Sequence, residues 1–467
     1  MKPPRALSLD ALRGYAIMTM ILSASEAFSI LPAWMYHCQV PPPAHIFNPH
    51  IYGITWVDLI FPFFLFSMGA AIPLSFRHHI CEGESPKHLA FKSVLRWLKL
   101  AFFAIFINHM FPYMLAGGNL KYLVPVGGFC LMFFMFMRNP LKVSETSAKV
   151  IHVAAYVLAL VWILFQPEAG GKTFSVYDSD IIILILSNMA LFGSLIYLLT
   201  RRNTIARLLV MIVVIALFTS AKATGSWAET VCQYSPFPWL YRFSYLEYLL
   251  VIIPGTFAGD ILFDWQNHNG EKEIQLMKLK KNRSPFILFL SLTLIASNVC
   301  LLYNRMLTAN VILTAIQLTG LYFLLKAEDG EMKMWTRLYH WGAWFLMIGL
   351  CFEAFEGGIR KDDVTISYLF TTSGLAFFGL LFFSLVSDYY HCKWISRPLE
   401  LVGKNPMMAY VMGSMVVIPL MEFSGLYDLL GIMDSNPWTG FLKGVIITAI
   451  CMSLTALFTI KKIFWKT

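Results

Sequence analysis

The sequence predicts an all-α, polytopic transmembrane helical bundle of about 11–14 spans, and three observations support this fold class. Of the 467 residues, 58% are hydrophobic and only 13% are charged, with a mean hydropathy of +0.64. Soluble domains carry roughly 25% charged residues, so this chain lacks the polar surface that a dissolved protein needs. Continuous apolar stretches of about 20 residues, the length needed to cross the hydrocarbon, recur along the chain. Such runs favour helices over the alternating strands of a barrel.

We expect a single integral membrane domain over residues 1–467, with fourteen helical segments. These segments lie near residues 8–31, 55–76, 91–111, 121–137, 148–166, 180–200, 204–221, 245–263, 284–304, 308–326, 336–353, 365–388, 400–421 and 438–460.

Lysine and arginine concentrate in alternate loops between these segments. Because cytoplasmic loops collect Lys and Arg, the pattern predicts that both termini lie in the cytoplasm. We expect the chain to be a multi-pass protein of the inner (plasma) membrane. The same asymmetry explains the net charge of +9, so we expect the lipid bilayer as a partner and no nucleic acid.

The first segment, SLDALRGYAIMTMILSASEAF, contains three charged residues. Asp10 and Arg13 are three residues apart and share one helical face. They form either an ion pair that anchors the helix end or a site in which Arg13 faces an anionic ligand. Glu26, near the outer end, is a candidate substrate contact because a carboxylate is expensive inside a membrane.

The outer loop before the second segment is rich in histidine. It contains His45, Asn48 and His50, as well as His37, and it has no Lys or Arg. A neutral imidazole backed by a carboxylate is the arrangement of a general base. Each histidine alone could equally be a surface side chain. Three histidines could also bind a metal, but none of them are paired at i, i+4 on a helix, so we expect no metal cofactor.

The carboxylate that could back such an imidazole is Asp58, in GITWVDLIFPFFLFSMG. Pro62 follows at i+4 and cannot donate to the carbonyl of Asp58, so we expect a kink there. A kink beside a carboxylate favours a cavity. We therefore expect the histidines of this loop as a group, together with Asp58, to carry chemistry.

Three later stretches carry further candidates. Lys404 and Asn405, in VGKNPMMAYV, begin a helix whose free backbone donors would suit a phosphate, although Asn405 could simply cap it. Arg360, in FEGGIRKDDVTISY, belongs either to a solvated charge run or to the rim of a substrate vestibule. The small residues of IIPGTFAGDILF indicate close helix packing.

Several of these stretches together resemble the heparan-α-glucosaminide N-acetyltransferases, a family of transmembrane acyltransferases. The matching pieces follow the family order and cover most of the chain except residues 139–240: SLDALRG, GITWVDLIFPFFLFSMG, IRKDDVTISYLFTTSGLAFF, VGKNPMMAYV and KKIFWK.

The resemblance implies transfer of an acetyl group from cytosolic acetyl-CoA to the amine of a terminal glucosamine across the membrane. Acceptors of this kind include heparan sulfate fragments, other amino sugars and cell-envelope glycans, and a hydroxyl acceptor is a second possibility. The family's essential histidine corresponds to Asn48 here, with His45 and His50 on either side. The resemblance therefore implies that His45 (favoured) or His50 is catalytic together with Asp58, and that Asn48 contacts substrate. Acetyl-CoA phosphates would lie near Arg13 and Lys404. A homodimer is possible.

The alternative from another class is a secondary transporter or flippase for a sugar or glycan. Broken helices and carboxylates within the membrane, such as Asp58 and Glu26, would suit it. Inverted repeats would favour this alternative, but the GITWVDLIFPFF pattern does not recur in the second half of the chain.

Overall fold

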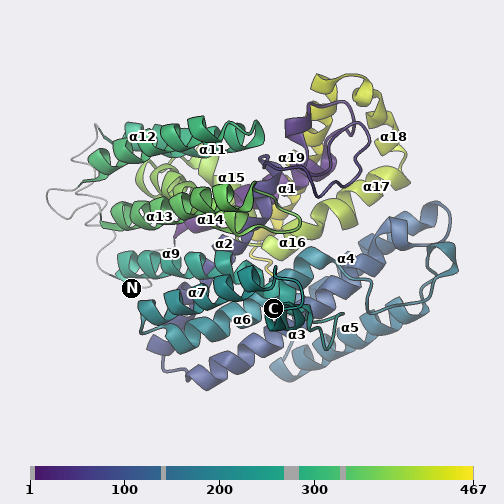
Figure 1. The fold of residues 1–467 in the computed structure, drawn as a ribbon. Helices are drawn as coiled ribbons and strands as arrows, with labels where there is room; N and C mark the ends of the chain where they lie inside the picture. The colour runs from purple at the N-terminus through teal and green to yellow at the C-terminus, as the bar shows by residue number, and fades with distance from the viewer. Residues whose placement is uncertain (1–5, 138–142, 268–282, 327–332, 466–467) are drawn as a thin grey trace.

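The computed structural model describes residues 6–137, 143–267, 283–326 and 333–465, and these residues form an all-α bundle (Figure 1). The α-helices are α1 (Leu7–Ser25), α2 (Ile60–Cys81), α3 (Pro86–Met110), α4 (Leu123–Phe136), α5 (Glu145–Phe165), α6 (Ile181–Thr200), α7 (Thr204–Ser220), α8 (Trp227–Gln233), α9 (Leu249–Asn267), α11 (Ser284–Tyr303), α12 (Leu307–Leu325), α13 (Lys333–Glu356), α14 (Ile366–Phe383), α15 (Lys393–Gly403), α16 (Pro406–Met412), α17 (Ile418–Phe423), α18 (Leu426–Leu430) and α19 (Pro437–Ile460).

Eleven helical segments in the described part of the chain are long and apolar enough to cross a membrane, so the protein is a multi-pass membrane protein. The predicted fold class is confirmed. Three further predicted spans fall on α1, α3 and α7. Of these, α1 and α3 carry charged residues and α7 is only 17 residues long. The span predicted near 400–421 corresponds to Pro406–Phe423, and it begins later than predicted because α15 ends at Gly403 and α16 begins at Pro406.

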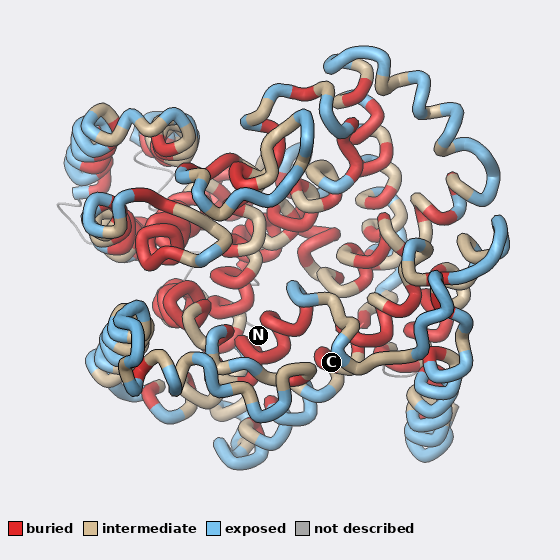
Figure 2. The backbone as a smooth tube through the Cα atoms, turned by 45° about the vertical axis from the view of Figure 1, so that its right-hand side comes forward, coloured by how far each residue is buried: buried red, intermediate tan, exposed pale blue. Residues whose placement is uncertain are grey.

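The helices form a buried centre and a lipid-facing periphery. The most apolar part of Ile366–Tyr389, which contains α14, is 94% buried, whereas that of α5 is only 22% buried (Figure 2). A peripheral helix can expose apolar side chains because lipid surrounds it. The central helices α1, α2, α6, α9 and α14 therefore form the frame on which a site can be built.

Close glycine contacts fix that frame. A Cβ atom at Gly255 or Gly259 of α9 would overlap the backbone carbonyl of Phe66 or Ala70 of α2. The predicted packing role of the IIPGTFAGDILF segment is thereby confirmed. A second crossing joins α1 to α15, where a Cβ at Gly14 would overlap the carbonyl of Leu399. Small residues let helix backbones approach closely where lipid provides no hydrophobic driving force.

The entry to α2 differs from our expectation of a kink at Pro62. A 3₁₀ turn, η2 (Val57–Leu59), precedes the helix, so Pro62 lies in the first turn of α2. Proline is tolerated there because the first-turn N–H groups have no helical partner. The carbonyl of Asp58 accepts a hydrogen bond from the Tyr368 hydroxyl at 2.7 Å instead. The turn that carries Asp58 is thus tied to α14.

Candidate functional site: two adjoining cavities and a histidine between carboxylates

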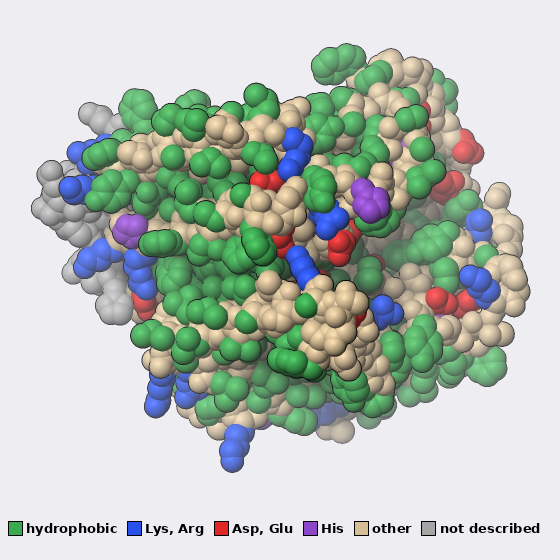
Figure 3. All heavy atoms as spheres, viewed as in Figure 1, with side chains coloured by type: hydrophobic (Ala, Val, Ile, Leu, Met, Phe, Trp, Pro, Cys, Tyr) green, Lys and Arg blue, Asp and Glu red, His purple; other side chains and the backbone are tan. Residues whose placement is uncertain are grey.

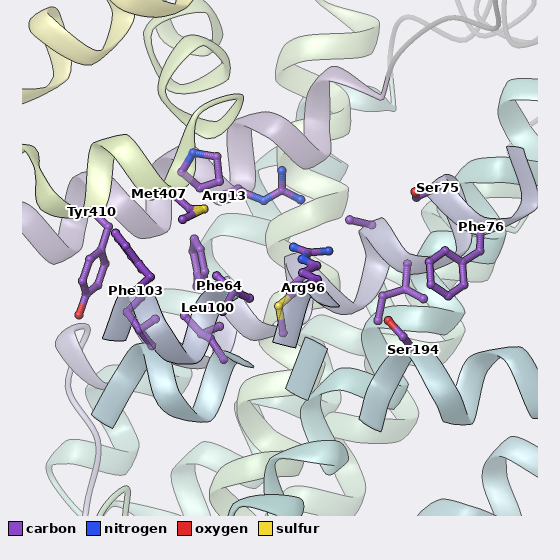
Figure 4. Close-up of a pocket in the computed structure, with 16 residues that line it drawn as sticks. Arg13, Phe64, Ser75, Phe76, Arg96, Leu100, Phe103, Ser194, Met407 and Tyr410 are labelled. Carbon is purple, nitrogen blue, oxygen red and sulfur yellow. The ribbon is translucent and has the colours of Figure 1, made fainter. Parts of the chain in front are cut away.

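The two ends of the central helices differ in character. We call the end at Leu7, Cys81 and Pro86 the basic side, and the end at Ser25 and Val57 the loop side. A cavity of about 210 Å³ opens between α1, α2, α3, α6 and α16 toward the basic side (Figure 4). Its lining is mostly apolar, with a few polar groups. It is lined by Arg13, Phe64, Met68, Ala71, Ile72, Ser75, Phe76, Arg96, Leu100, Phe103, Ile183, Leu186, Ser194, Pro406, Met407 and Tyr410.

Two arginines line this inner cavity from different helices. Arg13 of α1 donates to the carbonyls of Gly403 (3.3 Å) and Ser67 (3.2 Å) and lies 3.8 Å from Asp10. It therefore both anchors the helix and faces the cavity, so both predicted roles find support in its contacts. Arg96 of α3 lines the same cavity, and no described carboxylate pairs with it. Two guanidinium groups in one cavity suit an anion such as a phosphate.

A second cavity, of about 140 Å³, adjoins the first toward the loop side. Phe64, Leu186 and Tyr410 line both cavities. The outer cavity is also bounded by Val57, the residue before Asp58, and by Lys361. The two cavities together lead from the arginines on the basic side toward Asp58.

Tyr410, one of the shared lining residues, is anchored from the loop side. Its hydroxyl donates to Asp180 Oδ2 at 2.8 Å, while Asp180 Oδ1 caps α6 by accepting the Ile183 N–H at 3.0 Å. Burial raises the pKa of Asp180, and its hydrogen bonds partly oppose that shift. The Tyr410 ring is thus held in place where the two cavities meet.

Asp58 is fully buried and contacts a histidine that sequence analysis did not select. Its Oδ2 accepts hydrogen bonds from the Thr55 N–H (2.9 Å) and the Cys38 N–H (3.3 Å). Its Oδ1 lies 3.2 Å from Nδ1 of His37. Nδ1 also accepts the Gln39 N–H at 3.1 Å. Because Nδ1 has both a donor and an acceptor beside it, the ring can carry its proton on either nitrogen.

The other face of His37 meets the loop between α13 and α14. Nε2 lies 2.7 Å from Oδ2 of Asp362, whose side chain is 42% exposed, and the His37 side chain is 18% exposed. Burial acts to raise the pKa of Asp362, but the His37 hydrogen bond and the charge of Lys361 outweigh it and hold the pKa below its ordinary value. Lys361 Nζ lies 4.0 Å from Asp58 Oδ1. His37 therefore links a buried carboxylate to one that solvent reaches.

The expectation that His45 or His50 is backed by Asp58 is corrected by this geometry. Nε2 of His45 accepts the Ser29 N–H at 3.1 Å, and its ring packs edge-on against Phe28 and Tyr36. His50 is exposed, and its backbone N–H donates to Oδ1 of the exposed Asn48 at 3.0 Å. The chain between α1 and α2 folds so that position 37, rather than 45 or 50, reaches Asp58.

The two other residues predicted to contact substrate, Glu26 and Arg360, differ from each other in their surroundings. Glu26 is buried, and neither of its carboxylate oxygens has a hydrogen-bond partner among the described residues. Burial raises the pKa of Glu26 to about 8. Arg360 donates to the carbonyl of Pro49 (3.0 Å) and to Asp363 (2.8 Å) and stacks over Tyr52. Arg360 thus joins two outer loops, which argues against a freely solvated charge run.

The predicted phosphate site at Lys404 and Asn405 is corrected. Their backbone N–H groups donate to the carbonyls of Glu400 and Val402, so they are not free for an anion. The side chain of Asn405 does not cap α16 either. It donates to the carbonyl of Ile463 (2.9 Å) and accepts the Trp465 N–H (3.3 Å), which ties down the C-terminal segment. Pro406, the next residue, does line the inner cavity.

The outer surface, like the cavity walls, combines apolar side chains with a few charged groups. Figure 3 shows basic, acidic and histidine side chains gathered near a hollow in a face that is otherwise largely hydrophobic.

The comparisons with known proteins identify a family but no activity. Residues 5–262 match a family described as a domain of unknown function (DUF5009). The chain belongs to the DUF5009 family. It matches none of the curated proteins.

The DUF5009 match covers part of the site only. Four site residues lie within residues 5–262: Arg13, His37, Asp58 and Arg96. The remainder of the chain contributes Lys361, Asp362, Pro406 and Tyr410. Sequence reasoning missed His37 and Arg96 as site residues. Arg96 lies in a basic stretch that is typical of a cytoplasmic helix end, and no sequence signal separates it from Lys92 or its other neighbours.

Proposed function

We propose that this DUF5009 protein is a transmembrane acetyltransferase. It would move the acetyl group of acetyl-CoA from the basic side to the amine or hydroxyl of a glucosamine-type sugar on the loop side. The observation that carries the proposal is the pair of adjoining cavities, with two arginines lining the inner cavity and the Asp58–His37 pair beside the outer one (Figure 4).

The inner cavity supports binding of a phosphorylated, chain-like donor. Arg13 and Arg96 offer guanidinium groups from two helices, the chemistry that binds phosphate. Ligand pockets usually measure about 300–1,000 Å³, and each cavity alone is smaller. A narrow apolar passage of this kind suits a slender arm such as pantetheine better than a sugar ring. The thioester at its tip would then reach the outer cavity.

The outer cavity supports acyl transfer because a base lies beside it. In the tautomer with its proton on Nδ1, which gives up the bond from the Gln39 N–H, His37 would donate to Asp58 and leave Nε2 to accept a proton from the acceptor. Asp58 then stabilises the imidazolium that forms, as a buried carboxylate does behind a catalytic histidine. Asp362 lies on Nε2 in this structure, so its exposed side chain must turn aside when an acceptor binds.

The direction of transfer follows from the distribution of charge. The excess of Lys and Arg predicts that the basic side is cytoplasmic, where acetyl-CoA is found. The loop side would then face outward from the plasma membrane, toward cell-envelope glycans or other amino sugars.

Reconstituted vesicles test the proposal. Protein is inserted into liposomes, labelled acetyl-CoA is supplied on one side, and a panel of amino sugars is supplied on the other. We expect label on the acceptor without mixing of the two compartments. Absence of acetylated product, together with uptake of unmodified sugar, would identify a transporter instead.

Donor binding has its own test through a matched pair of variants on α3. Loss of one charged hydrogen bond to phosphate costs about 1.5–3 kcal/mol, so Arg96→Ala should weaken CoA binding roughly 10- to 100-fold. Lys99→Ala, on the same helix but outside the cavity lining, should leave binding unchanged. Thermal stabilisation by CoA measures both, and equal behaviour of the two variants would remove the donor site from the inner cavity.

A further inference from the structure

Lys361 connects the outer cavity to the catalytic pair. It is the one charged residue among the described residues that line this cavity, and its Nζ lies 4.0 Å from Asp58 Oδ1. That separation exceeds hydrogen-bond length, and Nζ has no hydrogen-bond partner among the described residues. A lysine ammonium has three donors. No described residue takes a hydrogen bond from them, and the ammonium group, paired at 4.0 Å with Asp58, lies at the wall of a cavity whose other lining side chains are apolar or weakly polar.

The backbone around Lys361 is held firmly on both sides. Gln39, which is fully buried, accepts the Asp362 N–H at 2.8 Å and donates to the Asp362 carbonyl at 2.9 Å. The Gly53 N–H donates to the Ile359 carbonyl at 2.8 Å. Because the loop is anchored before and after position 361, the backbone of Lys361 is fixed in advance of any ligand, and the attraction of Asp58 at 4.0 Å orients the ammonium group. Preorganised charge of this kind costs little reorganisation during a reaction.

Acyl transfer creates a need for such a group. When a nucleophile adds to a thioester, the carbonyl oxygen acquires negative charge, and donors placed near it lower the barrier. The two hydroxyl groups on the wall of the outer cavity already donate hydrogen bonds elsewhere. Ser23 Oγ donates to the Met20 carbonyl, and the Tyr410 hydroxyl donates to Asp180. Lys361 is left as the available cationic donor.

We propose that Lys361 is a catalytic residue whose ammonium group stabilises the oxyanion of the tetrahedral intermediate. This inference rests on the proposed acetyltransferase function and adds a residue to it. The lone pair of the acceptor nitrogen or oxygen forms a bond to the acetyl carbon, and the carbonyl π pair moves to the oxygen facing Lys361. His37 Nε2 takes the acceptor's proton. The C=O bond then re-forms, the C–S bond breaks, and its electron pair leaves with CoA as the thiolate.

Three lysine variants test this role in the full-length protein. Lys361→Met removes charge and donors at nearly constant length, and removal of one oxyanion donor lowers kcat roughly 10²- to 10³-fold. The KM for acetyl-CoA should change little. Lys361→Arg should recover part of the rate. Lys172→Met, an exposed lysine of the loop between α5 and α6, serves as the matched control and should behave like the wild type.

A change of acyl group separates oxyanion stabilisation from a merely structural role. Fluorine withdraws electrons and stabilises the tetrahedral oxyanion by itself. The rate loss caused by Lys361→Met should therefore be smaller with fluoroacetyl-CoA than with acetyl-CoA. Equal losses with both donors, or a Lys361→Met rate within threefold of wild type, would overturn the inference and leave the acetyltransferase proposal intact. A wild-type protein that transfers no acetyl group would overturn both.

Discussion

Two histidine–carboxylate pairs in this protein use the same groups in different surroundings. His109 Nδ1 lies 2.7 Å from Glu168 Oε1 and its Nε2 lies 3.0 Å from the Ser175 carbonyl, and both side chains of the pair are at most 3% exposed. His37 also has both nitrogens occupied, but one of its partners, Asp362, is 42% exposed. A sealed pair holds loops together, whereas a pair that opens to solvent can exchange a partner for a substrate.

The two pairs also differ in what surrounds them. The His109–Glu168 pair fastens the end of α3 to the loop before α6, and neither residue lines a described cavity. The His37–Asp58 pair adjoins the outer cavity through Val57 and Lys361. Burial and distance alone would not separate the two pairs. The His37–Asp58 pair is distinguished because it adjoins the outer cavity on one side and, through Asp362, reaches solvent on the other.

The largest expected effect is loss of activity when the open pair is broken. General-base catalysis contributes about 10²–10⁴-fold, so His37→Gln should lower acetyl transfer by that factor while CoA still stabilises the protein. His45→Gln is the matched control, because the His45 ring contacts Ser29 and two aromatic rings and has no hydrogen bond or ion pair with a carboxylate among the described residues. Initial rates with labelled acetyl-CoA provide the measurement. Full activity of His37→Gln, or an equal loss in both variants, would contradict the assignment of the base.

Breaking the sealed pair should affect stability rather than chemistry. Leaving one partner of a buried hydrogen bond unsatisfied costs about 1–3 kcal/mol, so Glu168→Leu should lower the unfolding temperature. The activity of the molecules that remain folded should change little. Glu82→Leu removes an exposed carboxylate near the end of α2 and should leave the unfolding temperature almost unchanged. A Glu168→Leu protein with normal stability and lost activity would contradict the structural role given to the His109–Glu168 pair.

Glu26 is a third case to compare with the two pairs: a buried carboxyl group that has no histidine as a described hydrogen-bond partner. Its pKa is raised from 4.5 to about 8, so the folded protein keeps a proton that the unfolded chain releases. Stability should therefore fall as pH rises from about 4.5 to about 8, by at most about 1.4 kcal/mol per pH unit. Glu26→Gln should remove this part of the pH dependence, and Glu82→Gln should not. Unfolding temperatures measured across this pH range give the result, and identical slopes for wild type and Glu26→Gln would refute it.

The fold was predictable because apolar length is a strong signal in a membrane protein. Each predicted segment contains a helix, since backbone groups in lipid must bond within their own helix. The break between α15 and α16 was missed, because hydropathy does not register the glycine crossing that holds α15 against α1.

The site was only partly predictable. Arg13 lines a cavity as predicted, and Asp58 lies next to Val57, which lines the outer cavity, because charged side chains inside apolar segments tend to face a cavity or a partner. The choice among loop histidines failed because it used distance along the chain. The backbone N–H of Cys38 bonds to Asp58, which brings the neighbouring His37 into contact, and no local pattern encodes that long-range turn.

The hydrogen bond from the Tyr368 hydroxyl to the Asp58 carbonyl limits which fragments of the chain can keep the candidate site intact. Residues 5–262, the portion shared with other DUF5009 members, contain Asp58 but not the α14 phenol that completes its helix start, nor the lysine and tyrosine that close the cavities. A fragment truncated after α9 would therefore leave that carbonyl without its donor and the passage without a wall. The candidate site therefore draws on the whole chain, and trimming the protein to residues 5–262 should yield an incomplete site.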